Sequence, residues 1–141
     1  MLIIKHTVQT TAPVWAVWQI LSDVSTWSVW DQELEYSSIN GPFVAGTTGK
    51  VKFKNSPELP MQLTLVKPQT LWDCTIKLLG ARFLSSHLVV ESGDKTYVTF
   101  TTEVKGPLAF FWAFLIGRNT KKKVPVEMLM MVKKAEELSK H

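Results

Sequence analysis

Four of the six tryptophans in this 141-residue chain lie in one short N-terminal segment. Trp15 and Trp18 are three residues apart behind Pro13, and Trp27 and Trp30 follow after a polar turn. Proline is favoured at the start of a helix, and residues three apart share a helix face. Burying so much aromatic area requires a large apolar surface. We therefore expect two short helices here that close one end of a sheet, with a large core or a cavity behind them.

The remainder of the chain shows two different periods. Apolar and polar residues alternate over residues 2–10 and in six further segments between Trp30 and Gly106, which predicts seven strands. Hairpin-length turns join these segments, so the sheet should be antiparallel. After Gly106, apolar residues recur at helical spacing toward the C-terminus. Pro125 should interrupt or bend this helix, because proline has no amide hydrogen and clashes with the preceding turn.

This order predicts an α+β fold in a single domain over residues 1–141. A seven-stranded curved antiparallel sheet would wrap around a long C-terminal helix, with two short helices between the first and second strands. A hydrophobic content of 45% suffices for a substantial core, and a charged fraction of 20% argues against disorder. The gap between a curved sheet and a helix is where we expect a ligand.

Composition excludes several classes of protein. The net charge of +4 suits an anionic partner surface, but it is too low for a nucleic-acid binder, and no nucleic-acid-binding motif is present. Cys74 is the single cysteine, which rules out an internal disulfide and suits a reducing cytoplasm. The N-terminus does not resemble a signal peptide, and the apolar run Leu108–Ile116 is about half the ~20 residues that a membrane span needs. The three histidines, His6, His87 and His141, lack metal-ligand spacing, so we expect no metal and no cofactor.

Several segments together resemble the START-like or SRPBCC superfamily, whose helix-grip fold is shared by polyketide cyclases and dehydratases, plant pathogenesis-related allergens and lipid-transfer domains. The resemblance covers nearly the whole chain and rests on the following motifs: APVWAVWQILSD at Ala12–Asp23, Trp27, Trp30-Asp31, GTTGKV at Gly46–Val51, His87, Gly93, Thr96, and Glu103 to Pro107. It implies a hydrophobic cavity between the sheet and the C-terminal helix. It transfers no catalytic residue, because the superfamily carries many activities on one fold.

We expect the cavity to bind a hydrophobic or amphipathic small molecule of lipid-, quinone- or polyketide-like character. Apolar burial would supply most of the affinity, and a few polar groups would set the orientation. The predicted lining residues are Tyr36, Phe53, Leu63, Trp72, Cys74, His87, Phe100, Phe111 and Leu115.

Two of these residues are candidates for catalysis. His87 could act as a general base or orient a ligand, or it could be a core histidine hydrogen-bonded to a neighbouring strand. The alternation of the second strand puts Tyr36 on the same side as Leu34, where its hydroxyl could meet a ligand or only water. Glu33 and Glu35 fall on the opposite, solvated side. The sequence leaves open whether the chain is a binding protein or a cyclase- or dehydratase-like enzyme that uses His87 as base and Tyr36 as donor.

A basic cluster forms the only concentration of charge, at Arg118, Lys121, Lys122 and Lys123. Next to the apolar segment that ends at Ile116, it could make transient contact with an anionic membrane, or it could be a solvated turn. A third class of function is an interaction protein that resembles the co-chaperone or membrane-associated branches of the superfamily. Such a protein would expose an apolar patch beside the cluster.

Overall fold

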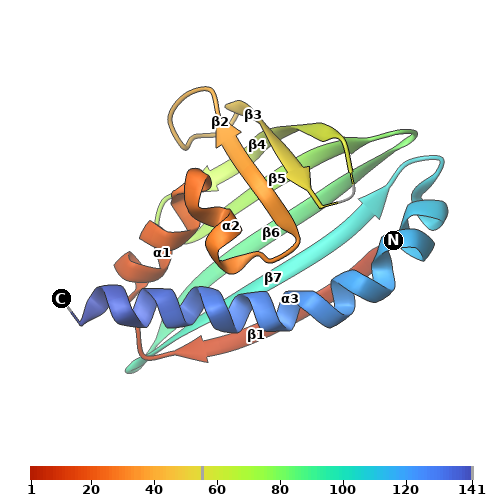
Figure 1. The fold of residues 1–141 in the computed structure, drawn as a ribbon. Helices are drawn as coiled ribbons and strands as arrows, with labels where there is room; N and C mark the ends of the chain where they lie inside the picture. The colour runs from red at the N-terminus through yellow and green to blue at the C-terminus, as the bar shows by residue number, and fades with distance from the viewer. Residues whose placement is uncertain (55, 141) are drawn as a thin grey trace.

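A computed structural model describes residues 1–54 and 56–140, and it has the predicted helix-grip architecture. The elements follow one another as one strand, three short helical segments, six strands and one long helix (Figure 1). Their bounds are β1 Leu2–Thr10, α1 Val14–Ser22, η1 Val24–Thr26, α2 Trp27–Trp30, β2 Leu34–Ile39, β3 Thr48–Phe53, β4 Glu58–Lys67, β5 Leu71–Leu78, β6 Ala81–Ser92, β7 Lys95–Lys105 and α3 Ala109–Ser139.

The seven strands form one antiparallel sheet in the order β1-β7-β6-β5-β4-β3-β2. Each strand from β2 onward pairs with the next, whereas β1 pairs with β7, so the first strand lies beside the last. The sheet curves, and α3 lies across its open side (Figure 1). Gly106 ends β7 at a φ of 121°, a conformation that residues with a side chain rarely adopt, and the chain then turns into α3. This arrangement confirms the predicted fold class.

The tryptophan-rich segment forms α1, η1 and α2, which pack over one end of the sheet (Figure 1). Pro13 precedes α1 in an extended conformation, and Trp18 and Leu21 point inward and are buried. The second helical region consists of η1 followed directly by α2, which runs from Trp27 to Trp30. Both tryptophans are buried, and the Trp27 indole N–H donates to the Leu21 carbonyl oxygen at 2.8 Å.

The helix α3 runs without interruption through Pro125 and bends about halfway along its length (Figure 1). The expectation of a bend rather than a break is therefore the correct alternative. A proline inside a helix is tolerated when it removes only one backbone hydrogen bond and the chain can bend away from the clash. Beyond it, Met128, Met131 and Val132 are buried and anchor the C-terminal half in the core. No helix within the described residues is long and apolar enough to cross a membrane.

The strand β2 departs from its predicted alternation. Its pairing with β3 shifts register between Leu34 and Tyr36, so that Leu34 and Ser37 are buried while Glu35 and Tyr36 are exposed. A bulge of this kind adds one residue to the strand, so the side chains after it point to the opposite faces of the sheet from those that strict alternation predicts. The assignment of Tyr36 to the inner face was therefore wrong.

Candidate ligand-binding site

A cavity of about 380 Å³ lies between the sheet, α2 and α3. Native interiors contain few voids larger than a water molecule, so a space of this size is not an ordinary packing defect. Strands β3 to β7 supply most of its wall and α3 closes it. The lining residues are Trp27, Trp30, Asp31, Glu33, Leu34, Val51, Phe53, Lys54, Ser56, Leu59, Trp72, Cys74, Ile76, Leu78, Phe83, Ser85, His87, Phe100, Thr102, Trp112, Ile116, Asn119, Thr120, Lys123, Val124 and Glu127.

The inner end of the cavity is an aromatic stack centred on Trp72. The Trp27 ring lies parallel to the Trp72 ring at 5.1 Å between centroids, and the His87 ring stacks on Trp72 at 3.6 Å. Phe100 meets His87 edge-on at 4.5 Å. Because all four side chains are buried, this wall is rigid and presents flat apolar surface to a ligand.

His87 is held as a neutral ring. Its Nδ1 lies 3.2 Å from the Trp72 carbonyl oxygen, which can only accept, so Nδ1 carries the proton. Nε2 then accepts a hydrogen bond from the Ser85 hydroxyl at 2.9 Å. Burial lowers the pKa of His87 to about 3, although the bond to the Trp72 carbonyl favours the charged form. Both nitrogens are occupied and the ring is not protonated near neutral pH, which makes His87 a poor general base.

We expect His87 to show no titration between about pH 5 and 8, the range in which an ordinary histidine changes charge. The unfolded chain takes up a proton below its ordinary pKa of 6.5 while the folded chain does not, so this residue lowers stability as the pH falls from 6.5 toward 3. NMR chemical shifts of the ring protons, assigned by their loss in His87→Gln, measure the titration. A midpoint near 6.5 would contradict the buried, doubly bonded ring.

Two buried indole N–H groups have no hydrogen-bond partner among the described residues. They belong to Trp30 and Trp72, which are 5% and 1% exposed and both line the cavity. Leaving a buried donor unpaired costs about 1–3 kcal/mol, so native proteins rarely leave one without a partner. An acceptor group of a ligand, or a water molecule held with it, would satisfy these donors.

A pair of carboxyl groups lines the α3 side of the cavity. Glu127 on α3 and Asp31 after α2 are hydrogen-bonded to each other, and Glu127 is only 8% exposed. Burial, followed by the charge of Asp31, raises the pKa of Glu127 to about 9. Burial also raises the pKa of Asp31, whose Oδ1 accepts the Glu33 amide N–H. At neutral pH Glu127 is therefore protonated and can donate its proton to Asp31.

Four further residues make this side of the cavity polar. Lys123 lies 3.9 Å from Glu33 across the gap between α3 and the start of β2. Lys54 and Asn119 are exposed while lining the cavity, so the cavity opens to solvent between the end of β3 and the middle of α3. The site thus combines an apolar aromatic interior with a charged opening.

The structure brings five of the nine predicted lining residues together. Phe53, Trp72, Cys74, His87 and Phe100 line the cavity. Burial raises the pKa of Cys74 to about 12, so its thiol stays protonated and unreactive. Among residues 1–54 and 56–140, no group of three or more His, Cys, Asp or Glu side chains is placed to bind a metal. His141 lies outside the described residues.

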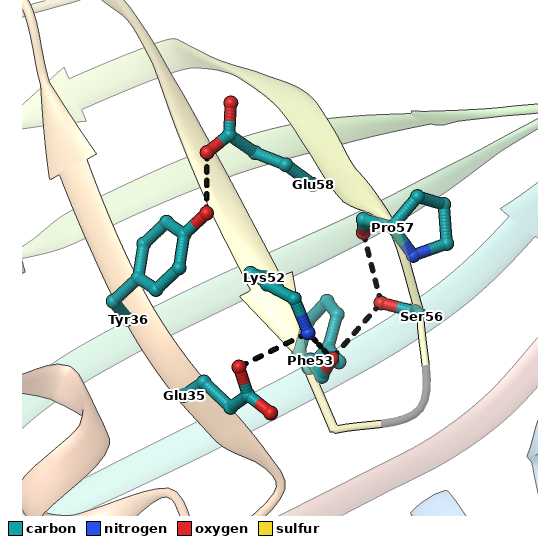
Figure 2. Close-up of polar contacts among 7 residues, drawn as sticks. All are labelled: Glu35, Tyr36, Lys52, Phe53, Ser56, Pro57 and Glu58. Atoms are coloured by element: carbon teal, nitrogen blue, oxygen red, sulfur yellow. Dashed lines mark hydrogen bonds and ion pairs between the residues drawn. The ribbon is translucent and has the colours of Figure 1, made fainter.

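Tyr36, the second catalytic candidate, lies outside the cavity. The bulge in β2 turns it to the outer surface, where its hydroxyl donates to Glu58 on β4 (Figure 2). That bond raises the pKa of the Tyr36 hydroxyl. Its neighbour Glu35 pairs with Lys52 at 3.0 Å in the same surface cluster, so the expected solvated position is correct for Glu35 but wrong for Glu33, which lines the cavity. The proposed His87–Tyr36 pair is therefore not assembled.

The other three predicted residues also lie elsewhere. Leu63 is fully buried in the core beside the cavity. Phe111 and Leu115 are 45% and 53% exposed on α3. Each precedes a cavity-lining residue, Trp112 or Ile116, and one residue turns an α-helix by about 100°. The apolar stripe read from the sequence is wider than the face that the sheet covers.

Sequence reasoning missed Glu127. It lies on the helix side that runs from Trp112 through Ile116 and Lys123, where it is enclosed by buried Met128 and Met131. One indication was available in the sequence. Glu127 lies among apolar methionines, at a helical spacing from Trp112 that puts both residues on the same side of the helix. Asp31 holds the chain at the entry to β2 through its bond to the Glu33 amide, and its contact with Glu127 could not be read from the sequence.

A family model described as polyketide cyclase / dehydrase and lipid transport matches residues 1–128. The chain belongs to this family. Comparison with curated proteins finds no match. Among solved structures, norcoclaurine synthase from Thalictrum flavum in complex with dopamine and hydroxybenzaldehyde has a TM-score of 0.71 at 18% identity, covering 95% of this chain and 86% of that one. The fold of this polyketide cyclase / dehydrase and lipid transport family member is thus shared with a structure of low sequence identity.

Two bacterial structures show the same likeness. The Zhui aromatase/cyclase from Streptomyces sp. R1128 has a TM-score of 0.76 at 12% identity, covering 94% of this chain and 92% of that one. A conserved protein from Geobacillus kaustophilus has a TM-score of 0.70 at 16% identity, covering 94% of each chain. At these identities the likeness establishes the fold of the family member and no activity.

Proposed function

We propose that this protein binds a compact apolar or amphipathic molecule in the cavity between the sheet and α3. The observation that carries the proposal is the 380 Å³ cavity itself, walled by an aromatic stack and containing two unpaired buried indole donors. Ligand sites in proteins are typically concave, mostly apolar and about 300–1,000 Å³ in volume, with few polar groups that fix the orientation.

The volume favours a small ring system over a long lipid. It holds roughly a dozen water molecules at about 30 Å³ each, which suits two or three fused rings better than a diacyl lipid. The solved relative with norcoclaurine synthase activity was crystallised with dopamine and hydroxybenzaldehyde, which are both aromatic. A polyketide-like or quinone-like ring with oxygen acceptors would meet the Trp30 and Trp72 donors.

Filling the cavity from α3 should abolish binding of a hydrophobic probe. Ile116→Trp adds an indole to the cavity wall, and we expect it to weaken binding of 8-anilinonaphthalene-1-sulfonate at least tenfold, because the added side chain occupies the probe's space. Fluorescence titration measures the affinity. Val126→Trp is the matched control, since Val126 is 47% exposed on the same helix and does not line the cavity.

Equal affinity in wild type and Ile116→Trp would place the probe outside the cavity and remove the support for the proposal. Native mass spectrometry of the purified protein, with organic extraction of any co-purifying molecule, then identifies a natural ligand. A bound ring compound of lipid, quinone or polyketide character would give the chemical class directly.

The enzymatic alternative is favoured by one observation, the Asp31–Glu127 carboxyl pair. A protonated Glu127 can donate a proton to a ketone oxygen, and the neighbouring Asp31 carboxylate, when ionised, can accept one, as cyclisation or dehydration requires. These two residues replace His87 and Tyr36 as the candidates. If the protein turns over a polyketide-like ketone, Glu127→Gln should abolish turnover while probe binding remains; unchanged turnover would exclude this role.

A further inference from the structure

The first half of α3 carries an exposed apolar surface on the side away from the cavity. Phe110 and Phe114 are 68% and 83% exposed, and Leu115 beside them is 53% exposed. We call these three residues the α3 patch. Exposed aromatic side chains of this size, gathered on one helix end, mark a surface that contacts something other than water.

The N-terminus extends this surface. Met1 and Leu2, both more than half exposed, line the same groove as the α3 patch, and Figure 1 shows the start of the chain beside the start of α3. The β5–β6 turn is tied to this end as well, because the Trp112 indole donates to the Leu79 carbonyl oxygen at 2.8 Å and Leu79 is 81% exposed. One end of the molecule is therefore apolar over three separate parts of the chain.

Three cations follow the α3 patch along the helix. Arg118 and Lys122 continue the four-residue row that begins with Phe110 and Phe114, and Lys121 lies beside them. At a rise of about 1.5 Å per residue, Arg118 is roughly 6 Å behind Phe114 along the helix axis. All three cations are exposed and none forms an ion pair with another described residue. No Asp or Glu lines the groove within the part of the chain that the structure describes.

We propose that this end of the molecule docks on an anionic lipid bilayer, with the α3 patch among the acyl chains and Arg118, Lys121 and Lys122 at the level of the phosphates. The order of side chains matches a membrane surface, because interfacial helices bury their apolar residues about 5–10 Å into the boundary between headgroups and acyl chains while basic residues meet the anionic headgroups. A second copy of this chain is a poorer partner, because pairing two such surfaces would bring six like charges together. This inference does not depend on the identity of the cavity ligand.

Lys123 has a different role from the other members of the basic cluster. It lines the cavity and pairs with Glu33, so it does not belong to the docking surface. The opposite side of the same helical turns, at Trp112 and Ile116, lines the cavity. Docking would therefore hold a ligand cavity within one helix diameter of the lipid.

Sedimentation with vesicles tests the docking. The wild-type protein should bind vesicles of phosphatidylcholine with phosphatidylserine, bind pure phosphatidylcholine weakly, and dissociate as salt is raised. Arg118→Gln, Lys121→Gln and Lys122→Gln combined should lower partitioning into the anionic vesicles about a hundredfold, at about a factor of five for each cation. Phe110→Ser with Phe114→Ser should abolish binding through loss of the inserted rings. These side chains are exposed, so folding is retained.

The control combines Leu129→Ser with Lys133→Gln and Lys134→Gln, which alter exposed apolar and basic residues on the C-terminal half of the same helix. It should bind vesicles as the wild type does. Ile116→Trp should also keep vesicle binding, which separates failure of this proposal from failure of the cavity proposal. Binding that is insensitive to the phenylalanines and cations, or self-association through Phe110 and Phe114 without vesicle binding, would overturn the inference.

Discussion

Trp72→Ala should lower the free energy of unfolding by about 3–5 kcal/mol, the range for truncating a buried aromatic residue. Trp72 is 1% exposed and stands at the centre of the aromatic wall, in contact with Trp27, His87 and Phe43. Removing it merges its volume with the existing cavity. The neighbouring rings are anchored on different elements and cannot collapse into the space. The protein therefore keeps the full energetic penalty of the enlarged cavity.

Urea unfolding followed by circular dichroism measures this change. Trp15→Ala is the matched control, because Trp15 is 49% exposed and its loss should change stability by less than about 1 kcal/mol. Trp72→Phe keeps much of the stacking surface and removes the unpaired indole donor, so it should cost less than half as much as Trp72→Ala. A Trp72→Ala protein as stable as Trp15→Ala would show that the aromatic stack does not support the fold.

Glu127→Gln should make the protein more stable than the wild type, by a margin that grows at up to about 1.4 kcal/mol per pH unit between pH 4.5 and about 9. The pKa of Glu127 is about 9 in the folded protein and 4.5 ordinarily. Between these values the folded chain holds a proton that the unfolded chain releases. Stability therefore falls as the pH rises through this window, by at most about 1.4 kcal/mol per unit, and the contribution is fully present only below 4.5.

The glutamine variant removes this dependence while preserving the contact, because its amide N–H can still donate to Asp31. Unfolding by urea at about pH 6, 7.5 and 9 gives the difference between variant and wild type at each pH. Glu137→Gln, on the exposed side of the same helix, controls for the loss of one acidic group and should leave the slope unchanged. Parallel stability curves for wild type and Glu127→Gln would mean that Glu127 is charged in the folded protein at neutral pH.

Much of the fold could be predicted because its determinants are local. Alternation with period two, short turns and a long segment of helical periodicity define seven antiparallel strands and one C-terminal helix without reference to tertiary contacts. The tryptophan-rich segment could be assigned to short helices for the same reason. The sequence predicted either an interruption or a bend at Pro125. It could not decide between them, because the continuation of the helix depends on packing against the sheet.

The candidate site was only partly predictable, because it depends on which side of a strand or helix each side chain points to. One extra residue in β2 moved Tyr36 from the expected inner face to the outer surface, and a bulge leaves no trace in a pattern of six residues. On α3, the stripe from Phe111 to Ile116 is apolar around more than half of the helix. The position of the sheet decides which side of this apolar segment faces the cavity. The side that the sheet leaves exposed is the α3 patch.

The sequence by itself determined the order of elements, the antiparallel sheet and the presence of a large aromatic core, because each follows from spacing along the chain. Only the tertiary structure decided that Asp31 and Glu127, which are distant in sequence, share a proton beside that core. Burial raises both pKa values, and the charge of Asp31 raises that of Glu127 further, which happens only once α2 and α3 are packed together. The tertiary structure also decided that Phe110 and Phe114 stay exposed, because no described strand of the sheet covers that side of α3.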